Sequence, residues 1–252
     1  MVNKLGIIGG SGFSNLHEFR IDEVYTLETP YGKSSDKYVA GKLNDLDIVF
    51  LPRHGADHSI PPHKINYRAN LYGFKQLKVS EIVSITAVGG ISENCQILKL
   101  VVPDNLIDYT WGREHTFYEG DKRSMEMMNS FLDHIDFTQP FNGSVRKKII
   151  SASKIADIPI VKDGVYAVTQ GPRLETAAEI EKLKIDGADI VGMTAMPEAA
   201  LARELGIPYA NLSMVVNLAA GMGSVDFSLE EIIKNLEIVG QDALKVILNY
   251  KL

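Results

Sequence analysis

Residues 189–216 have the sequence DIVGMTAMPEAALARELGIPYANLSMVV. The pattern predicts a buried strand over Asp189–Met193, a short helix over Ala199–Leu205 and a second strand over Tyr209–Val216. Gly206 and Pro208 end the helix, because neither residue continues a helical backbone readily. A strand, a helix and a strand in succession are typical of a sheet covered by helices, so this stretch indicates an α/β fold.

The same alternation extends over the rest of the chain. Strands are predicted over Leu5–Ile8, Asp47–Leu51, Glu81–Ala87, Leu98–Pro103 and Val165–Gln170, and helices over Tyr67–Gln76, Val145–Ala156, Thr176–Ile185 and Ser228–Leu248. No linker-like composition, charge block or internal repeat divides the 252 residues. We therefore expect one domain over residues 1–252, with a mixed central β-sheet flanked by helices.

The composition narrows the classes of function. The formal net charge of −6 argues against broad binding to nucleic acid or to anionic membranes, but it is compatible with a local anion site. Cys95 is the only cysteine, so no intrachain disulfide can form and a reducing compartment fits. No apolar stretch reaches the roughly 20 residues of a membrane span, and the N-terminus lacks a secretory segment. We therefore expect a cytoplasmic protein.

Unusual polar groups follow most of the predicted strands. They are Ser11, Arg53, His54, Thr86 with the backbone of Ala87, Glu175, Met193, Thr194 and Asn217. In α/β sheets, ligands bind outside the carboxyl ends of the strands. We therefore expect these residues to meet in one shared site.

Two of these groups are suited to an anion. The glycines of Gly9-Gly-Ser-Gly12 let backbone N–H groups approach an anion, and a tight structural turn is the alternative interpretation. A dinucleotide fingerprint is incomplete because Asn15 stands where its third glycine belongs, and the Lys-Ser/Thr of a P-loop is absent. Arg53 and His54 are suited to phosphate, with a surface pair as the alternative.

A metal site is not expected. His54, His58 and His63 lie close together in the sequence, but their spacing does not fit one face of a regular helix. No cysteine or acidic cluster accompanies them as further ligands. The other candidate nucleophile, Cys95, lacks an activating histidine motif and is interpreted as a small buried residue.

Glu175 and Asn217 predict the substrate class. Glu175 follows the turn at Gly171-Pro172, and Asn217 follows a strongly apolar strand. A carboxylate accepts a hydrogen bond from a ring N–H, whereas an amide both donates and accepts. Together the two side chains are suited to the edge of a 6-oxopurine.

Seven segments, taken together, resemble the purine nucleoside phosphorylase family, in particular its trimeric branch, which includes methylthioadenosine phosphorylase. The segments are Ile7-Ile-Gly-Gly-Ser-Gly12, Arg53-His-Gly55, Asn66-Tyr-Arg-Ala-Asn70, Thr86-Ala-Val-Gly-Gly90, Gly171-Pro-Arg173, Met193-Thr-Ala-Met-Pro-Glu198 and Asn217. They occur in the order of the family and cover nearly the whole chain, so the combination is specific although each motif alone is weak.

The resemblance implies a role for each residue. Phosphate would be held by Ser11, Arg53, His54, Thr86, Ala87 and Thr194. The backbone of Met193 would contact the ribose, and Glu175 and Asn217 would bind the base. The protein would form a homotrimer, or a hexamer built from two trimers. In this assembly a neighbouring subunit would contribute His134 to the site. Asn217, Glu175 and His54 are the expected catalytic residues. Inorganic phosphate is the co-substrate, and no metal or organic cofactor is implied.

Departures from the family pattern indicate which base is bound. Members specific for adenine carry an Asp-x-Asp arrangement where this chain has Asn217-Leu-Ala219, and a serine where Glu175 stands. A 6-amino group donates and prefers carboxylates, whereas a 6-oxo group accepts and needs an amide donor. Because an unpaired buried polar atom costs about 1–3 kcal/mol, we expect hypoxanthine or guanine as the base.

The sugar end points to a methylthio group. Family members that bind a free 5′-hydroxyl place a histidine near the start of the last helix, where this chain has Leu229, with Ile232 one turn on and Leu174 in place of a phenylalanine. These residues predict an apolar 5′ pocket, with the core face of the helix as the alternative interpretation. Within the family, the nearest activity is phosphorolysis of S-methyl-5′-thioinosine to hypoxanthine and 5-methylthioribose 1-phosphate.

Other functions remain open at this point. Within the family they are a general inosine and guanosine phosphorylase or a methylthioadenosine phosphorylase. A non-catalytic purine-binding protein would keep the base pocket but would not need the phosphate residues. An NAD-dependent oxidoreductase would use the glycine turn, but the third glycine is missing.

Overall fold

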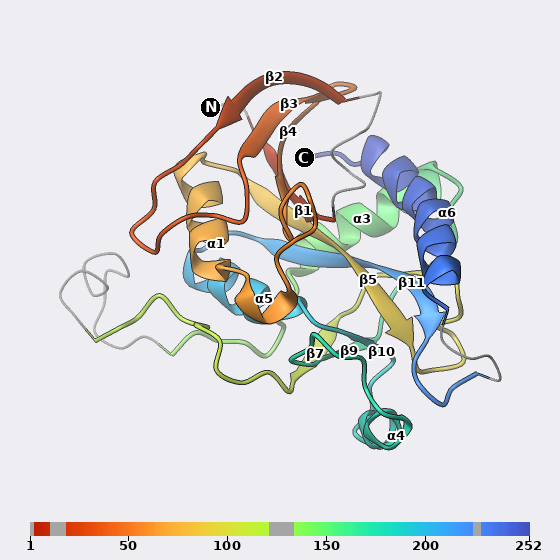
Figure 1. The fold of residues 1–252 in the computed structure, drawn as a ribbon. Helices are drawn as coiled ribbons and strands as arrows, with labels where there is room; N and C mark the ends of the chain where they lie inside the picture. The colour runs from red at the N-terminus through yellow and green to blue at the C-terminus, as the bar shows by residue number, and fades with distance from the viewer. Residues whose placement is uncertain (1–2, 11–18, 121–133, 224–227) are drawn as a thin grey trace.

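The structure is a computed structural model that describes residues 3–10, 19–120, 134–223 and 228–252. Eleven strands of this part of the chain form one mixed sheet (Figure 1). Its parallel centre consists of β1 (Leu5–Gly9), β4 (Leu46–Pro52), β5 (Glu81–Gly90) and β11 (Tyr209–Leu218). Every residue of β1 and nine of the ten in β5 are buried, as expected for strands covered on both faces.

The remaining strands extend the sheet from this centre. Beyond β4 the antiparallel strands β3 and β2 follow, β5 pairs with the series β10, β9 and β7, and β11 pairs with β6, which pairs with β8. Their bounds are Phe19–Tyr25 for β2, Tyr38–Leu43 for β3, Leu100–Val101 for β6, Asn105–Asp108 for β7, Ile160–Val161 for β8, Val165–Val168 for β9 and Ile190–Gly192 for β10.

Helices cover both faces of the sheet (Figure 1). On one face α1 (Tyr67–Gln76) contacts α5 (Ala195–Glu204), and on the other α3 (Gly143–Ile155) contacts α6 (Leu229–Leu248). Helix α4 (Ala177–Ile185) follows the loop after β9. A mixed sheet flanked by helices confirms the predicted α/β fold.

The helices begin where the sequence provides a capping side chain. Asn66, Asn142 and Ser228 accept hydrogen bonds from backbone N–H groups in the first turns of α1, α3 and α6. In α4 the pair Thr176 and Glu179 forms a complete capping box. The capping box fixes the backbone directly after Glu175, the predicted base-binding residue.

Several predicted boundaries needed correction. Helix α5 begins at Ala195 rather than Ala199, with non-helical backbone at Met196, and β11 runs two residues past Val216. Strands β2, β3, β7 and β8 were not predicted. Strand β2 is exposed at five of its seven positions, so it lacks the apolar alternation that identifies a strand.

The neighbours of β5 change partway along its length. On one side β1 pairs with Glu81–Ser84, and β10 pairs antiparallel with Gly89 and Gly90. Between these two partners, no described strand pairs with residues 85–88 on that side. The sheet is therefore open at this point, beside the carboxyl ends of β1 and β4.

Candidate active site

The opening beside β5 exposes a backbone donor. Ala87 is exposed, whereas the other residues of β5 are buried. The carbonyl oxygen of Ile85 faces the opening, because it accepts a hydrogen bond from Arg53, which follows β4. Backbone groups alternate along a strand, so the N–H of Ala87, two residues on, faces the same side. Ala87 is therefore placed as predicted for an anion-binding backbone donor.

The antiparallel direction of β10 brings Met193 and Thr194 to the same opening. Gly192 follows Val191, which pairs with Gly89, so the chain after β10 runs back toward Ala87 and Thr86. Thr194 is buried and precedes α5, but its side chain makes no capping hydrogen bond. Strand β10 thus reaches the opening from the direction opposite to β1 and β4, as the mixed sheet allows.

Thr86, the residue before Ala87 in β5, is buried. Its hydroxyl donates to Asn211 Oδ1 at 3.2 Å and lies 3.3 Å from Ser213 Oγ, both on β11. A ligand that takes a hydrogen bond from Thr86 would therefore replace the bond to Asn211. Sequence reasoning did not identify Asn211 and Ser213, which look like ordinary strand residues.

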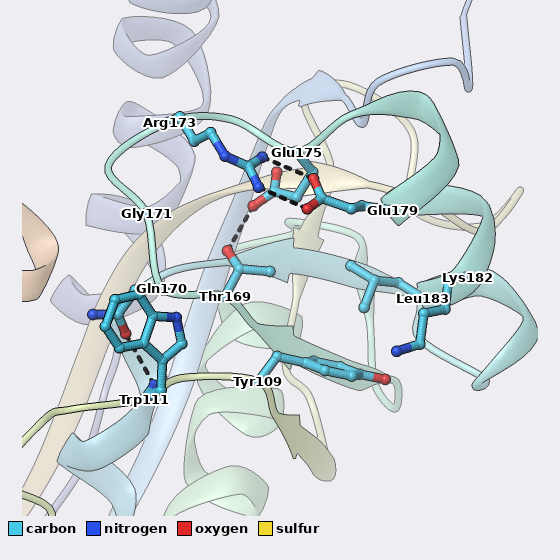
Figure 2. Close-up of a pocket in the computed structure, with 10 residues that line it drawn as sticks. All are labelled: Tyr109, Trp111, Thr169, Gln170, Gly171, Arg173, Glu175, Glu179, Lys182 and Leu183. Atoms are coloured by element: carbon cyan, nitrogen blue, oxygen red, sulfur yellow. Dashed lines mark hydrogen bonds and ion pairs between the residues drawn. The ribbon is translucent and has the colours of Figure 1, made fainter.

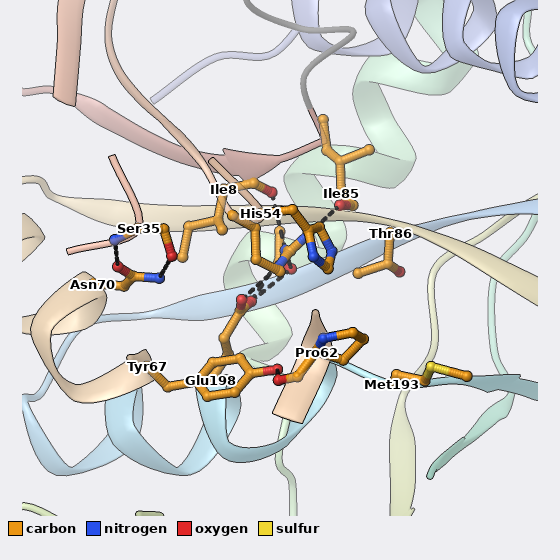
Figure 3. Close-up of polar contacts among 12 residues, drawn as sticks. Ile8, Ser35, His54, Pro62, Tyr67, Asn70, Ile85, Thr86, Met193 and Glu198 are labelled. Carbon is orange, nitrogen blue, oxygen red and sulfur yellow. Dashed lines mark hydrogen bonds and ion pairs between the residues drawn. The ribbon is translucent and has the colours of Figure 1, made fainter. Parts of the chain in front are cut away.

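Arg53 lies in a buried network rather than free in the opening. Figure 3 shows its partners Ile8, Ile85 and Glu198, each at the end of a dashed line. Its guanidinium donates to both oxygens of Glu198, to Ser84 Oγ, and to the carbonyl oxygens of Ile8 and Ile85. Only one N–H, on Nη1, lacks an acceptor among the described residues. This guanidinium therefore joins neighbouring strands and has one donor left for a ligand, so the role of Arg53 in holding phosphate stays a prediction.

Glu198, in the first turn of α5, completes this network. It is fully buried and also accepts hydrogen bonds from Ser84 Oγ and from the Tyr209 hydroxyl, each at 3.0 Å. Burial lowers the pKa of Arg53, but the charge of Glu198, its hydrogen bond and the nearby tyrosines together more than offset this, so the pKa is raised. Glu198 ends the family-like segment Met193–Glu198, but its role as the partner of Arg53 was not predicted.

His54 is partly buried next to Arg53, and its ring has a defined tautomer. Its Nδ1 lies 2.8 Å from the carbonyl oxygen of Ile60, which can only accept, so Nδ1 carries the hydrogen. Burial, followed by the neighbouring Arg53 charge, lowers the pKa of His54 to about 4. At neutral pH, Nε2 is therefore an acceptor, suited to a protonated phosphate oxygen.

The lowered pKa of His54 predicts a loss of stability in mild acid. An unfolded histidine has a pKa of about 6.5, so between that pH and about 4 the unfolded chain binds a proton that the folded chain does not. The contribution of His54 to the free energy of unfolding is fully present above the unfolded-state pKa of about 6.5. It is lost as the pH falls from there toward about 4. At pH 5 the expected loss is about 2 kcal/mol relative to pH 7.

Urea unfolding in phosphate-free buffer at the two pH values measures this loss. His54→Gln, which removes the titrating group, should show a smaller decrease between pH 7 and pH 5 than the wild type. Equal decreases in the two proteins would contradict a lowered pKa at His54.

The predicted base-binding residues share one cavity of about 590 Å³. Its lining includes Leu174, Glu175, Asn217, Ala219 and Ile232, all of which were predicted to contact the nucleoside. Residues of β10, β11 and α6 complete the wall. The carboxylate and the amide that were expected to meet around a purine therefore do face one cavity.

A β-bulge positions Asn217. The register of β11 against β5 shifts between Val215 and Asn217, which leaves Val216 as the extra residue. Asn235 of α6 donates to the carbonyl oxygen of Val216 at 2.9 Å, so the bulge is held from outside the sheet. Asn217 then pairs with Gly89, two residues or about 7 Å along β5 from Ala87. The base cavity and the predicted phosphate donors thus lie on adjoining parts of the same strands.

The loop that carries Glu175 is held close to the end of β10. Gly171 has φ of 61°, and a Cβ at this position would lie 2.4 Å from Met193 Sδ, so only glycine fits the turn. Thr169, at the start of the loop, donates its hydroxyl to Glu175 Oε1 at 2.6 Å (Figure 2). The Met193 side chain is therefore packed against the base loop.

Arg113 joins the base loop to the chain that follows β10, a role that no sequence motif indicated. Its buried guanidinium donates to the carbonyl oxygens of Gln170 and Met193, at 2.8 and 2.7 Å, and to that of Met196 at 2.7 Å. It also donates to Gln170 Oε1 at 3.1 Å. Arg113 occupies one lone pair of the Met193 carbonyl oxygen, which leaves its second lone pair and the Met193 N–H for the predicted ribose contact.

Three described residues that were predicted to bind the nucleoside do not line the cavity, namely Met193, Leu229 and His134. Leu229 is 61% exposed and does not line it, whereas Ile232 does. His134 is exposed and is not among the lining residues of its own chain, and its predicted loan to a neighbouring subunit stays a prediction. Ser11 lies outside the described residues. The α6 side of the cavity also holds Ser228, Glu231 and Asn235, so the wholly apolar 5′ pocket that was expected is mixed in character.

The described residues contain neither a cluster of metal ligands nor a membrane-spanning helix. Within this part of the chain, no group of three or more histidine, cysteine, aspartate or glutamate side chains is placed to hold a metal ion. None of its helices has the length and apolar character needed to cross a membrane.

A family model described as the phosphorylase superfamily matches residues 4–251. The chain belongs to the phosphorylase superfamily. This match confirms the family that the seven motifs indicated. The superfamily match extends over all the strands and helices described above, so the cavity and the opening beside β5 are parts of a phosphorylase fold.

Individual relatives agree with this assignment. The chain is 46% identical over 233 residues to a probable S-methyl-5′-thioinosine phosphorylase of Xylella fastidiosa. The matched region covers 92% of this chain and 91% of that relative. The chain is also 41% identical over 246 residues to the 6-oxopurine nucleoside phosphorylase of Pyrococcus furiosus. That matched region covers 97% of this chain and 91% of the relative. A solved structure of methylthioadenosine phosphorylase from Schistosoma mansoni with tubercidin has a TM-score of 0.90 at 32% identity, covering 98% of this chain and 90% of that chain.

Proposed function

We propose that this phosphorylase cleaves 6-oxopurine nucleosides with inorganic phosphate, and that its main substrate is S-methyl-5′-thioinosine. The observation that carries the proposal is the placement of Glu175 and Asn217 in one cavity, with Ala219 beside them. Glu175 accepts from the N1–H of the base, and Asn217 donates to O6 or N7. The relatives named for 6-oxopurine substrates, at 46% and 41% identity, support this choice of base.

The reaction is a displacement at C1′ of the sugar. A phosphate oxygen attacks C1′ while the bond from C1′ to N9 breaks, and the electron pair of that bond leaves with the purine. Positive charge develops on the sugar and negative charge on the base. Phosphate, held by Ala87 N–H, Thr194 and the neighbouring groups, stabilises the first charge, and Asn217 stabilises the second. The products are hypoxanthine and 5-methylthioribose 1-phosphate, with no covalent enzyme intermediate.

The 5′ group is the second part of the proposed substrate. Leu174 and Ile232 offer apolar surface, and the Xylella relative is named for a methylthio substrate. The second candidate is a general 6-oxopurine nucleoside phosphorylase, which the polar groups of Ser228, Glu231 and Asn235 favour because they could bind a 5′-hydroxyl.

A phosphorolysis panel tests both parts of the substrate. We expect kcat/KM for S-methyl-5′-thioinosine to exceed that for methylthioadenosine by about tenfold or more, because a 6-amino group leaves the Asn217 donor unpaired. Inosine and guanosine test the 5′ group, and equal rates for inosine and S-methyl-5′-thioinosine would favour the general phosphorylase. Faster cleavage of methylthioadenosine would exclude the base assignment, and release of base without phosphate would indicate a hydrolase.

The proposal includes an assembly and a location. A homotrimer, or a hexamer of two trimers, would allow the exposed His134 of one subunit to reach the cavity of another. The predicted cytoplasmic location fits a chain with a single, buried cysteine. Both remain predictions.

A further inference from the structure

The hydroxyl of Thr169 fixes one oxygen of the Glu175 carboxylate. The distance from Thr169 Oγ1 to Glu175 Oε1 is 2.6 Å (Figure 2). A hydroxyl has one hydrogen and the carboxylate can only accept, so Thr169 is the donor. The same hydroxyl lies 3.4 Å from the Gly192 carbonyl oxygen, a longer contact that competes weakly. A hydrogen bond to a charged oxygen is stronger than one between neutral groups.

Thr169 is held in place independently of Glu175. Its backbone N–H donates to the carbonyl oxygen of Gly192 at 2.8 Å, and its own carbonyl oxygen accepts from Arg113 at 3.3 Å. Arg113 also binds the carbonyl oxygen of the next residue, Gln170, at 2.8 Å. The hydroxyl is therefore in position before any ligand binds.

Glu175, by contrast, needs support from elsewhere. It is partly exposed and precedes α4, and no described side chain other than Thr169 donates to its carboxylate. A glutamate has three rotatable side-chain bonds, and a substrate that binds an unsupported carboxylate must order it. With Oε1 held by Thr169, the acceptor positions of Oε2 remain for a ligand.

We propose that Thr169 is a specificity-determining positioning residue, which holds Glu175 so that Oε2 faces the N1–H of a 6-oxopurine. This inference rests on the proposed function, in which Glu175 binds the base. A 6-aminopurine has an unprotonated N1 that cannot donate to Oε2. Its binding is therefore not strengthened by the hydrogen bond from Thr169 to Glu175. Thr169 therefore favours 6-oxopurines without contacting the substrate itself.

Thr169→Val tests the hydroxyl while keeping the shape of the side chain. We expect kcat/KM for S-methyl-5′-thioinosine or inosine to fall about tenfold, mainly through KM, since one hydrogen bond to a charged group is lost. Thr169→Ser keeps the hydroxyl and should stay within about twofold of the wild type by the same argument. Thr169→Ala is the second variant without a hydroxyl, and melting temperatures show whether each variant is folded.

A substrate without N1–H separates positioning from general damage. The rate with 1-methylinosine should be low in the wild type and unchanged by Thr169→Val. The same substitution in a Glu175→Ala background should have no further effect on either substrate. Equal losses on inosine and 1-methylinosine, or a full loss in the Glu175→Ala background, would overturn the proposal.

The outcomes also separate this inference from the proposed function. If Glu175→Ala leaves kcat/KM for 6-oxopurine nucleosides intact, then the base assignment itself is wrong. If Glu175→Ala lowers it but neither Thr169→Val nor Thr169→Ala does, then only the role of Thr169 is wrong.

Discussion

Replacing Asn217 with aspartate is expected to move the preference of the enzyme from 6-oxopurines toward 6-aminopurines. The Asn217 side chain lines the base cavity, and its Nδ2 has one hydrogen bonded to the Leu218 carbonyl oxygen and a second one for a ligand. An aspartate has no donor for O6, and its charge opposes the negative charge that develops on a leaving 6-oxopurine. Its oxygens can instead accept from a 6-amino group.

The size of the change follows from the cost of an unpaired polar group. About 1–3 kcal/mol for each mispaired contact corresponds to roughly tenfold to hundredfold in the ratio of kcat/KM for S-methyl-5′-thioinosine to that for methylthioadenosine. Steady-state kinetics on both substrates measure the ratio. Asn217→Ala is the matched control, because it removes the donor without adding an acceptor and should lower the rate on 6-oxopurines only. An unchanged ratio in Asn217→Asp would remove this residue from base recognition.

The fold could be predicted where sequence patterns are strong. The helix over Tyr67–Gln76 was predicted to the residue, because its apolar spacing is regular and Asn66 caps it. The antiparallel edge strands β2 and β3 were missed. Strand β2 is largely exposed, and β3 contains Gly41, where a Cβ would lie only 2.1 Å from the Arg20 carbonyl oxygen of β2. Their pairing depends on that close approach, which no local pattern displays.

The candidate site was predictable as a set of residues but not as a set of contacts. Motif order identified Glu175, Asn217 and Ala219, and the structure places them in one cavity. The long-range partners were not accessible, because Arg53 and Glu198 are separated by 145 residues and only the folded sheet brings them together. The same holds for Arg113, whose acceptors are mostly backbone carbonyl groups and therefore leave no trace in side-chain patterns.

Removing the carboxylate of Glu198 is expected to be the most destabilising single substitution among those considered. Glu198→Ala would leave the guanidinium of Arg53 buried without its counter-charge, and it would also remove an acceptor from Ser84 and Tyr209. Breaking a buried ion pair by removing one partner costs about 3–5 kcal/mol. Urea unfolding at pH 7 measures the loss, and Asp242→Ala, which breaks the exposed pair with Lys245, should change stability by less than about 0.5 kcal/mol.

A second variant separates the lost pair from the cavity that alanine creates. In Arg53→Met/Glu198→Leu both charges are absent, so no unpaired buried charge remains and part of the stability should return relative to Glu198→Ala. Activity should not return with it, because the carbonyl oxygens of Ile8 in β1 and Ile85 in β5 lose their common donor. A double variant that is as unstable as Glu198→Ala would mean that packing around α5, rather than the charge of Arg53, dominates the cost. Recovery of stability without activity would show that the pair is retained for the geometry of the site.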